Sequence, residues 1–501
     1  MASTFMGLSI ASRGLAASQT GLAVTSSNIS NVNTTGYSRQ VVNQVSIGPA
    51  AVYSNNSVVG SGVEVTSVDR VRSFRLDQKY WQENSSLGEW EAKSAYLEEI
   101  ETIFGGADDS FSTTMEEFYS ALEDLSTDPG SSSARAVVLQ TGAAVCEYLN
   151  DSSERLAQLR DDINSDIKTT MQQINSYAQQ IAGLNQQIAV ASGSGVSTNE
   201  LDDQRDALID KLSALADIEV AEDSYTITVA GSTLVSGSKA RQLECSTIAG
   251  SDGMYGMKWA DSGKSFDAGD SGALKAYLDL RDGSTSANKG IPYYISQLDT
   301  FAQTVAKAFN EGIYKDGSTY YSGHAGGYGL DGSTGIRFFS YSDVDGNSLS
   351  SEELMASGAT TDEIYANITA ANISLSADIL EDSSKIAASS SVDEEGNNEN
   401  IDDLISLCSD TRMFDSGTPE DYYNSIISTL GTASSYAQRQ YDLQSTITTY
   451  IDNSRSSVSG VSTDEETANL TKYQLAYNAS AQMISTWNQI YATTINMVSS
   501  D

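Results

Sequence analysis

The first thirty residues carry an apolar stripe that repeats every seven positions, with Ser, Thr and Gln at most positions between its members. The stripe consists of Leu8, Leu15, Leu22 and Ile29, and Phe5 and Ala11 lie beside it. A seven-residue repeat is typical of a helix that packs lengthwise against another helix. We therefore expect the chain to begin with such a helix.

A polar segment, NISNVNTTGYSRQ (28–40), follows this stripe directly. The short side chains of its Asn, Ser and Thr residues compete for backbone hydrogen bonds, and Gly36 permits a positive φ. The first helix is therefore predicted to end here in a turn.

The last forty residues mirror this arrangement. One apolar series steps by seven through Leu470, Tyr477, Ile484, Tyr491 and Val498. Tyr473 and Trp487 widen the same face, and a second series flanks it: Ala476, Met483, Ile490 and Met497. In front of the helix, Ser462 can act as an N-cap, and the acidic residues 464–466 place negative charge at the positive end of the helix dipole.

Either stripe alone is explained most simply by an amphipathic helix that packs on the core of its own domain. Both helices, however, lie at the extreme ends of the chain, where helices usually fray. Because their repeats match, we expect the two helices to pair with each other and close the molecule. The outward faces of such a pair would be poorly covered in a monomer.

Helical periodicity also fills most of the middle of the chain. Residues 75–190 are predicted to form successive helices, the last of them from Leu156 to Val190. Residues 197–215 and 418–453 supply further helices that can pack against it. A rod-like core built from both halves of the chain is therefore expected.

Three segments depart from helical periodicity. Residues 218–260 alternate with a period of two and have Gly at the turns, which predicts short strands and hairpins. Residues 315–375 are rich in Gly, Ser, Asp and Tyr and are predicted to be a small inserted domain or an elaborate loop. Residues 389–403 have the composition of a solvated acidic linker. The predicted fold class is mainly α, with a small β-rich part.

Composition narrows the possible functions. The 501 residues are 39% apolar, which is enough to bury cores in two or three domains. The net charge of −39 argues against binding nucleic acid or an anionic membrane by general electrostatics. The sequence has neither the run of ~20 apolar residues of a membrane-spanning helix nor the pattern of a secretory signal, so we expect no membrane insertion and no cleaved signal.

An enzymatic function has little support in the sequence. The single histidine, His324, lies in the Gly-rich stretch YYSGHAGGYG, which predicts a surface loop rather than an active site. Cys146 or Cys408 could act as a nucleophile only if His324 lay close, and no local motif indicates this. The three cysteines, which include Cys245, also lack the spacing of a metal site or a small disulfide framework. No catalytic or cofactor-binding residue is therefore assigned.

The segment DVDGNSLSSEE (343–353) has some features of a calcium-binding loop. With Asp343 and Asp345 at positions one and three, Gly346 falls at position four instead of six, and Leu354 occupies position twelve, where Glu is required. An Asp-Gly turn explains the segment better, so no metal site is expected.

Three blocks of the sequence resemble the flagellar hook-associated protein 1 family, the first hook-filament junction proteins among the flagellar axial proteins. ISNVNTTGYSRQ is similar to the N-terminal signature, with Thr35 where the family usually has Pro. LDDQRDALIDKLSALADIEV (201–220) and SGVSTDEETANLTKYQLAYNASAQMIST (459–486) resemble the internal and C-terminal blocks. Ser38 and the long middle helices favour this family over rod and hook proteins. The resemblance covers about residues 1–315 and 375–501.

The resemblance implies an elongated subunit with three parts. Paired N- and C-terminal coiled-coil helices, 1–50 with 455–501, would form the inner axial layer of a tubular assembly. Residues 51–314 with 376–454 would form a rod-like helical-bundle domain with β-hairpins near 218–260, and 315–375 a short outer domain. The residues expected to carry assembly are Leu8, Leu15, Leu22, Ile29, Gly36, Tyr37, Arg39, Leu470, Tyr473, Tyr477, Ile484, Trp487 and Tyr491.

The resemblance also implies partners and a location. The partners would be copies of this chain, hook protein, the second junction protein and a small cytoplasmic export chaperone that binds the C-terminal helix. Export through the flagellar type III apparatus needs no cleaved signal and would place the protein outside the cell, in the flagellum. The implied function is a structural subunit that joins hook to filament. The alternative is another axial component, such as a rod, hook or filament-like protein.

Overall fold

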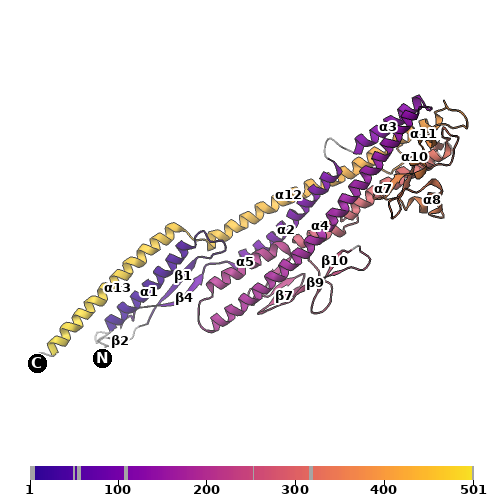
Figure 1. Ribbon diagram of the computed structural model, residues 1–501. Coiled ribbons are helices and arrows are strands. Elements are labelled where there is room, and N and C mark those ends of the chain that lie inside the picture. The colour runs from indigo at the N-terminus through magenta and orange to yellow at the C-terminus, as the bar shows by residue number, and fades with distance from the viewer. Residues whose placement is uncertain are drawn as a thin grey trace.

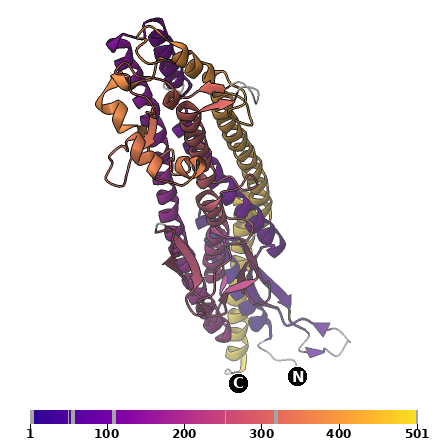
Figure 2. The same ribbon diagram turned by 90° about the vertical axis from the view of Figure 1, so that its right-hand side faces the viewer.

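The computed structural model describes residues 6–48, 51–52, 58–105, 111–251, 253–314 and 320–498. The molecule is an elongated, mainly helical rod, as the sequence predicts. Both termini lie at one end, and a compact lobe of short helices and strands lies at the other (Figures 1 and 2).

Long helices dominate the molecule. Their bounds are α1 (Met6–Ser30), α2 (Phe74–Phe104), α3 (Phe111–Thr127), α4 (Ser132–Gly193), α5 (Asn199–Leu215), α6 (Ala273–Asp282), α7 (Ile291–Glu311), α12 (Pro419–Ser459) and α13 (Thr463–Val498). Shorter helices are α8 (Ser351–Ala356), α9 (Thr361–Tyr365), α10 (Ala377–Glu381) and α11 (Glu399–Cys408).

The strands form small antiparallel sheets. Their bounds are β1 (Gln40–Ser46), β2 (Ala51–Val52), β3 (Val58–Val59), β4 (Val63–Arg70), β5 (Ile218–Val220), β6 (Ile227–Val229), β7 (Ser232–Ser236), β8 (Lys239–Ala240), β9 (Leu243–Thr247), β10 (Tyr255–Trp259), β11 (Gly312–Tyr314), β12 (Tyr320–Ser322), β13 (Phe339–Tyr341) and β14 (Ile373–Leu375). The hairpins predicted between 218 and 260 are present as the sheet β5–β8 and the pair β9–β10.

The terminal end consists of α1, α13 and a two-stranded ribbon. The first helix ends before a turn in which Gly36 has a φ of +81°, as predicted. β1 then pairs with β4, and this ribbon packs on α1. This ribbon was not predicted from the sequence, because its alternating residues lie directly beside the Asn-rich turn.

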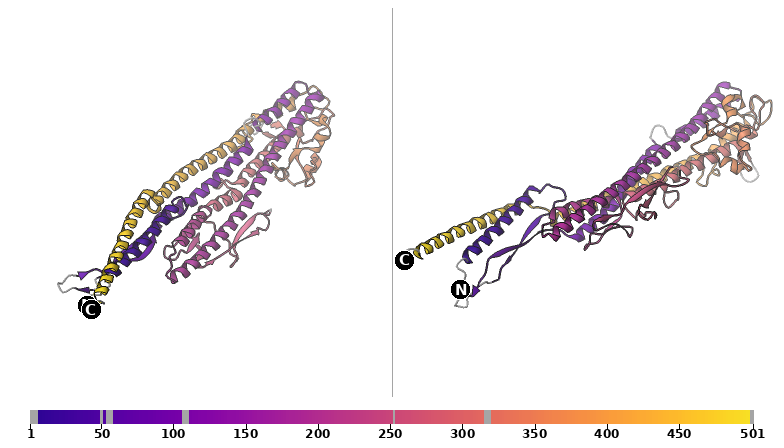
Figure 3. Two further views of the ribbon diagram at one scale, coloured as in Figure 1. Left: turned by 60° about the vertical axis from the view of Figure 1, so that its left-hand side comes forward. Right: turned by 60° about the horizontal axis from the view of Figure 1, so that its bottom comes forward.

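The rod is built from α2, α4, α5 and α12. α12 packs along α2, and α5 lies between α2 and α4, so the rod uses both halves of the chain (Figure 3). α4 is a single helix of 62 residues. It begins at Ser132, three residues after Pro129, and the side chain of its N-cap Ser131 accepts a hydrogen bond from the Ala134 backbone N–H at 3.3 Å. The predicted start at Leu156 was therefore wrong.

The lobe packs short elements against α3, α4 and α7. Phe118 of α3 meets the rings of Phe309, Phe338 and Phe339 with centroids 5.6–6.1 Å apart. The lobe continues beyond residue 375, since α11 packs on α3. Within α11 the side chains of Ile401, Leu404 and Leu407 are fully buried. The prediction of a solvated linker over 389–403 was therefore wrong for its second half, where apolar residues at helical spacing outweigh the acidic composition.

Candidate assembly site

α1 and α13 form an antiparallel pair with closely spaced backbones. Gly7 lies against Trp487, Gly14 against Ser480 and Gly21 against Tyr473. A Cβ at Gly21 would lie 2.6 Å from the Tyr473 ring, and one at Gly7 would overlap the Trp487 ring. Both sets step by seven residues, in opposite directions. Glycines on one helix thus receive the large side chains of the other.

The buried face of α1 consists of small and polar residues. Its members are Ala11, Ala17, Ser18, Gly21, Thr25 and Asn28. The predicted stripe is only half-buried. Its members Leu8, Leu15, Leu22 and Ile29 each follow by one residue a position that faces α13 or its start, namely 7, 14, 21 and 28. The glycine contact face of α1 was not predicted, although Gly7, Gly14 and Gly21 repeat every seven residues, as the predicted stripe does.

The contact face of α13 agrees better with the predicted residues. All of the predicted members are half-buried: Leu470, Tyr473, Tyr477, Ile484, Trp487 and Tyr491. The second predicted series lies beside this face and is exposed. Met483, Ile490 and Met497 are 48%, 45% and 70% exposed, and Leu475 and Ile495 are each 66% exposed.

A buried polar cluster closes the inner end of the helix pair. Asn28 Nδ2 donates to Glu466 Oε2 at 3.1 Å, and the Tyr37 hydroxyl donates to Asn28 Oδ1 at 2.9 Å. Arg39 Nε donates to Glu466 Oε1 at 3.0 Å, and Arg39 Nη1 lies 2.9 Å from Glu465 Oε2. The predicted residues Tyr37 and Arg39 therefore hold the two termini together. Burial raises the pKa of Tyr37, so its hydroxyl stays protonated and can donate.

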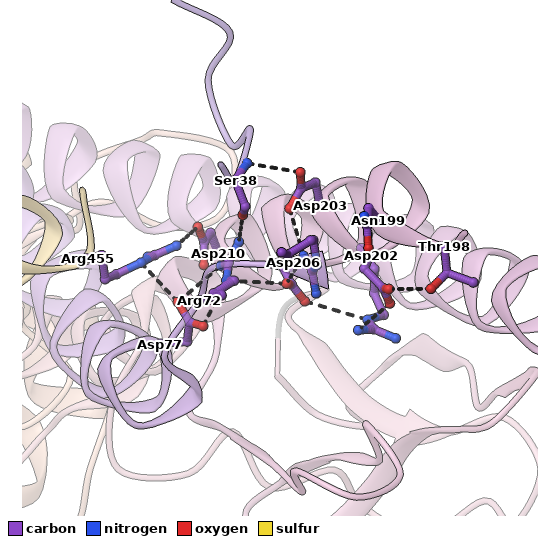
Figure 4. Close-up of polar contacts among 12 residues, drawn as sticks. Ser38, Arg72, Asp77, Thr198, Asn199, Asp202, Asp203, Asp206, Asp210 and Arg455 are labelled. Atoms are coloured by element: carbon purple, nitrogen blue, oxygen red, sulfur yellow. Dashed lines mark hydrogen bonds and ion pairs between the residues drawn. The ribbon is translucent and has the colours of Figure 1, made fainter. Parts of the chain in front are cut away.

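A denser network of charges joins the terminal end to the rod (Figure 4). Arg72, after β4, pairs with Asp77 of α2 at 2.8 Å. Arg455 of α12 lies 3.1 Å from Asp77 and 2.8 Å from Asp210 of α5. These contacts tie α2, α5 and α12 together at one level of the rod.

Two aspartates of α5 extend this network to the loop and the ribbon. Arg70 lies 2.7 Å from Asp203 and 2.9 Å from Asp206, and the Ser38 backbone N–H donates to Asp203 at 3.0 Å. Both aspartates belong to the internal block 201–220, whose acidic residues a surface helix would expose. Here they are buried because they face arginines from other elements.

The pKa shifts in this network reflect burial and charge together. Burial alone would lower the pKa of Arg72, but Asp206 and Asp77 raise it above its usual value. Burial raises the pKa of Asp210, and Arg455 opposes this shift. The network is therefore a set of buried charges that depend on one another, and removal of one partner leaves a charge uncompensated.

A cleft of about 880 Å³ lies where the rod meets the helix pair. The loop 31–39 and residues 456–462 around Gly460 line much of it, together with Arg72, Tyr80 and Lys211. α12 ends at Ser459, with Gly460 as its C-cap, and α13 starts at Thr463. The Arg39 backbone N–H donates to the Ser459 carbonyl at 2.8 Å, so the loop supports the bend between the two helices.

The residues considered for chemistry are His324 and the three cysteines. His324 is fully buried, so the predicted surface position was wrong. Its Nδ1 lies 2.8 Å from the Ile336 carbonyl, and its Nε2 accepts from the Ala387 N–H at 2.8 Å. Burial lowers the pKa of His324 to about 4, which keeps the ring neutral in these two hydrogen bonds. All three cysteines are free thiols.

The Asp343 segment forms a turn. Asp343 Oδ1 accepts from the backbone N–H groups of Asp345 and Asn347, each at 2.9 Å, and Gly346 has a φ of +82°. Among the described residues, no cluster of three His, Cys, Asp or Glu side chains is placed to hold a metal ion. In the same part of the chain, no helix is long and apolar enough to cross a membrane.

Comparisons with known proteins agree with this geometry. Residues 97–339 match the family described as flagellar hook-associated protein FlgK helical domain. Residues 8–37 match flagella basal body rod protein, and 453–497 match flagellar basal body rod FlgEFG protein C-terminal. These two matches cover most of α1 and α13.

Similar proteins cover almost the whole chain. Flagellar hook-associated protein 1 of Bacillus subtilis (strain 168) is 31% identical, with 99% of each chain covered. The protein of the same name from Escherichia coli (strain K12) is 26% identical over 97% of this chain and 98% of its own. The solved structure of the flagellar hook junction protein FlgK from Burkholderia pseudomallei has a TM-score of 0.61 at 16% identity. It covers 76% of this chain and 100% of its own length, so it supports the fold. On the strength of the full-length match, the chain belongs to the flagellar hook-associated protein 1 family.

Proposed function

We propose that this structural subunit joins hook to filament as the first junction protein, by polymerising through its terminal helices. One observation carries the proposal. Of the α13 residues whose burial the structure describes, Glu466 is the one that is buried, although the helix has 36 residues. Leu475 and Ile490 remain exposed on its outer face, and Ile495 is exposed near its end. A soluble monomer gains nothing from such a face, whereas an assembly can bury it.

The energetics favour burial against copies of the same chain. Each Å² of apolar surface removed from water contributes about 25 cal/mol, and this gain can offset the entropy lost when the terminal helices become fixed. The half-buried Leu8, Leu15, Leu22 and Ile29 lie beside the α1–α13 contact, where a neighbouring subunit can complete their burial. On α13, a neighbouring subunit would likewise complete the burial of the half-buried residues Leu470, Tyr473, Tyr477, Ile484, Trp487 and Tyr491.

Gly36, Tyr37 and Arg39 contribute to assembly indirectly. A Cβ at Gly36 would lie 3.4 Å from the Ala207 Cβ, so the turn approaches α5 closely. Tyr37 and Arg39 bind the start of α13 through Asn28 and Glu466. These residues thus fix the angle at which the helix pair leaves the rod.

The molecule would divide into three working parts. We proposed from the sequence that 1–50 with 455–501 form the axial part, but β1 and β4 pair across residue 50. The axial part therefore extends to about residue 72. The rod would comprise the following segment and 376–454, and the outer domain 315–375, whose first five residues lie outside the described part of the chain. The packing of α11 on α3 favours a longer outer lobe.

Partners and location follow from the family role. The tube of copies would contact hook protein on one side and the second junction protein on the other. The site would be extracellular, in the flagellum, after export without a cleaved signal. The mechanism needs no catalysis and no cofactor. The full-length match to hook-associated protein 1 does not favour the alternative of another axial component.

Electron microscopy of a deletion strain tests this function. We expect hooks without filaments and filament subunit shed into the medium. Re-expression of the full chain should restore filaments. Missing hooks would instead assign the chain to an earlier part of the axis, and normal filaments would refute the proposal.

An export chaperone would cover the α13 face before assembly. Tyr473, Tyr477, Ile484 and Trp487 are spaced four, seven and three apart and so share one helix face, which suits binding of a helix in an apolar groove. A pull-down with a chain that ends at Gly460 should lose the chaperone, while a full-length chain with His324→Asn in the distant lobe should keep it. Equal binding by the truncated chain would refute this placement.

A further inference from the structure

The terminal end holds together as one unit. α1 packs on α13 and on the ribbon of β1 and β4. The side chain of Asn28 joins these elements, because its Nδ2 donates to Glu466 of α13 at 3.1 Å and to the Gln40 carbonyl of β1 at 2.9 Å. We define α1, the loop 31–39, β1, β4 and α13 as the terminal unit. Since its parts bind one another, they are expected to keep their arrangement when the unit moves.

The terminal unit shares no apolar core with the rest of the molecule. The large core of rod and lobe lies between Phe74 and Ala437 and, in the described part of the chain, includes no residue of the unit. Nor does any described helix or strand of the unit pack along a helix of the rod (Figure 1). Two parts of a chain usually move relative to each other unless a large apolar interface joins them. Other contacts must therefore set the angle between unit and rod.

Two short segments connect the terminal unit to the rod. Residues 71–73 lead from β4 into α2, and residues 460–462 lead from α12 into α13. Neither segment belongs to a helix or a strand. The cleft of about 880 Å³ lies beside both, since 460–462 and Arg72 contribute to its lining. The unit therefore has two short pivots with open space next to them.

A small set of polar contacts with α5 fixes the angle seen here. Arg70 of β4 lies 2.7 and 2.9 Å from the carboxylates of two aspartates of α5, one of them Asp203. The Ser38 backbone N–H donates to the same Asp203 at 3.0 Å (Figure 4). Asn199, the first residue of α5, donates through Nδ2 to the Val68 carbonyl of β4 at 2.8 Å. All of these contacts tie the loop or the ribbon of the unit to one helix of the rod.

We propose that the terminal unit turns as a rigid body about 71–73 and 460–462, and that its polar contacts with α5 form a latch that holds the angle of the free subunit. The Arg39 backbone N–H also donates to the Ser459 carbonyl, but this contact lies directly beside 460–462 and can persist when the unit turns. Release of the latch loses only a few contacts. Neighbouring subunits that bind the turned unit better can therefore shift the population toward it.

This conformational device goes beyond the proposed function, although it would serve it. A subunit with one fixed angle fits one arrangement of neighbours, whereas a hinged subunit can present its terminal helices to two different polymers. The latch meanwhile keeps the free subunit in a single orientation. Hinge and latch are properties of the monomer, so they can be tested without an assembly and can fail independently of the proposed function.

Distances between spin labels on the purified full chain test both claims. One label at Gln474→Cys of α13 and one at Gln179→Cys of α4 report the angle between unit and rod. A second pair, Gln474→Cys with Ser12→Cys of α1, reports on the unit alone. All three positions are exposed. Cys245→Ser and Cys408→Ser remove the partly exposed native thiols, so that the chosen positions take the labels. Pulsed electron paramagnetic resonance then gives the distribution of distances for each pair.

Arg70→Met removes the charged part of the latch. We expect a narrow distribution of the Gln474–Gln179 distance when Arg70 is present, and an at least about tenfold larger population of other distances in the variant. The Gln474–Ser12 distribution should stay the same. The matched control, Arg155→Met, removes an exposed arginine of α4 that pairs within its own helix, and it should change neither distribution.

Asn199→Ala covers the case in which Arg70→Met does not fold. It removes one neutral contact and leaves no charge unpaired, so the fold should survive, and we expect a smaller broadening of the same kind. The latch is overturned if neither variant broadens the distance between unit and rod, or if that distance is already equally broad with the latch intact. The rigid body is overturned if the distance within the unit broadens as much as the distance between unit and rod.

Discussion

The two ends of the molecule bury their helices to different extents. At the lobe, α3 buries seven of its 17 residues, among them Phe111, Phe118 and Leu122. At the terminal end, α13 is twice as long and has Glu466 as its one buried residue among those whose burial the structure describes. Both helices are amphipathic by sequence. An apolar stripe in a sequence therefore predicts that a helix has a partner surface, but it does not show whether that surface belongs to the same chain.

The contacts at the two ends also differ in chemistry. The lobe packs aromatic rings against one another, and such packing buries a large area for each residue. The α1–α13 pair brings glycines against Trp487 and Tyr473, so its backbones approach closely, but the contact leaves most of α13 partly or fully exposed. The lobe is therefore expected to be stable in the monomer, and the helix pair to depend on neighbours.

Phe118→Ala should give the largest loss of stability. The side chain is 1% exposed and contacts three phenylalanine rings, so its removal leaves a cavity. We expect the free energy of unfolding to fall by about 3–5 kcal/mol. Chemical denaturation followed by circular dichroism measures this. Leu475→Ala, on the exposed face of α13, should change it by less than about 0.5 kcal/mol. If both substitutions lowered the free energy of unfolding equally, the lobe and the terminal end would not differ in stability as proposed.

Arg72→Met tests the network that connects the two ends. The substitution leaves Asp77 without its closest partner, although Arg455 still contacts it. We expect a loss of about 3 kcal/mol, at the lower end for a broken buried pair. Arg72→Met combined with Asp77→Leu should recover part of this loss, because no carboxylate is then left unpaired. A double variant less stable than the single one would show that packing, rather than charge, dominates here.

Acid should weaken the lobe through His324. Its pKa is lowered to about 4 by burial, against an ordinary value of 6.5, so the folded state binds fewer protons than the unfolded state between these values. The stability that the neutral ring contributes is complete above pH 6.5 and is lost as the pH falls towards 4. Arg135 and Arg337 add to this effect, because both disfavour a charged ring.

The expected loss is on the order of 3 kcal/mol between pH 7 and 4, measured as the free energy of unfolding at each pH. His324→Asn cannot titrate, so its stability should fall less over the same range. An identical pH dependence in both proteins would mean that other groups control the acid response.

The sequence predicted most of the helices because their periodicity is long and regular. It predicted the α13 face through Tyr473 and Trp487, since large residues at heptad positions are easy to recognise. The α1 face escaped because glycine weakens a helix in isolation, so Gly7, Gly14 and Gly21 do not stand out as contact residues. Their role depends on a partner helix some 460 residues away in the chain.

The burial of particular polar side chains could not be predicted from the sequence either. His324 sits among glycines, which usually indicate a loop, and one of its two hydrogen-bond partners, Ala387, is 63 residues away in the chain. Asp203 and Asp206 look like surface residues of α5 until Arg70 is brought to them by the β1–β4 ribbon. Local patterns do not contain such pairings, because the tertiary fold creates them.

Leu22→Asp should affect folding least and assembly most. Leu22 is half-buried beside the α1–α13 contact, so in the monomer the new carboxylate can remain in water. In the tube, a neighbour would enclose it without a partner, at a cost of several kcal/mol. We expect the thermal transition to stay within a few degrees of wild type, while junctions and motility are lost even though the protein is secreted.

Leu15→Asp should behave alike, and Leu22→Met, which keeps size and polarity, should stay motile. If Leu22→Asp melts the whole protein, α1 belongs to the core of the monomer, and if motility survives, the stripe is not an axial contact.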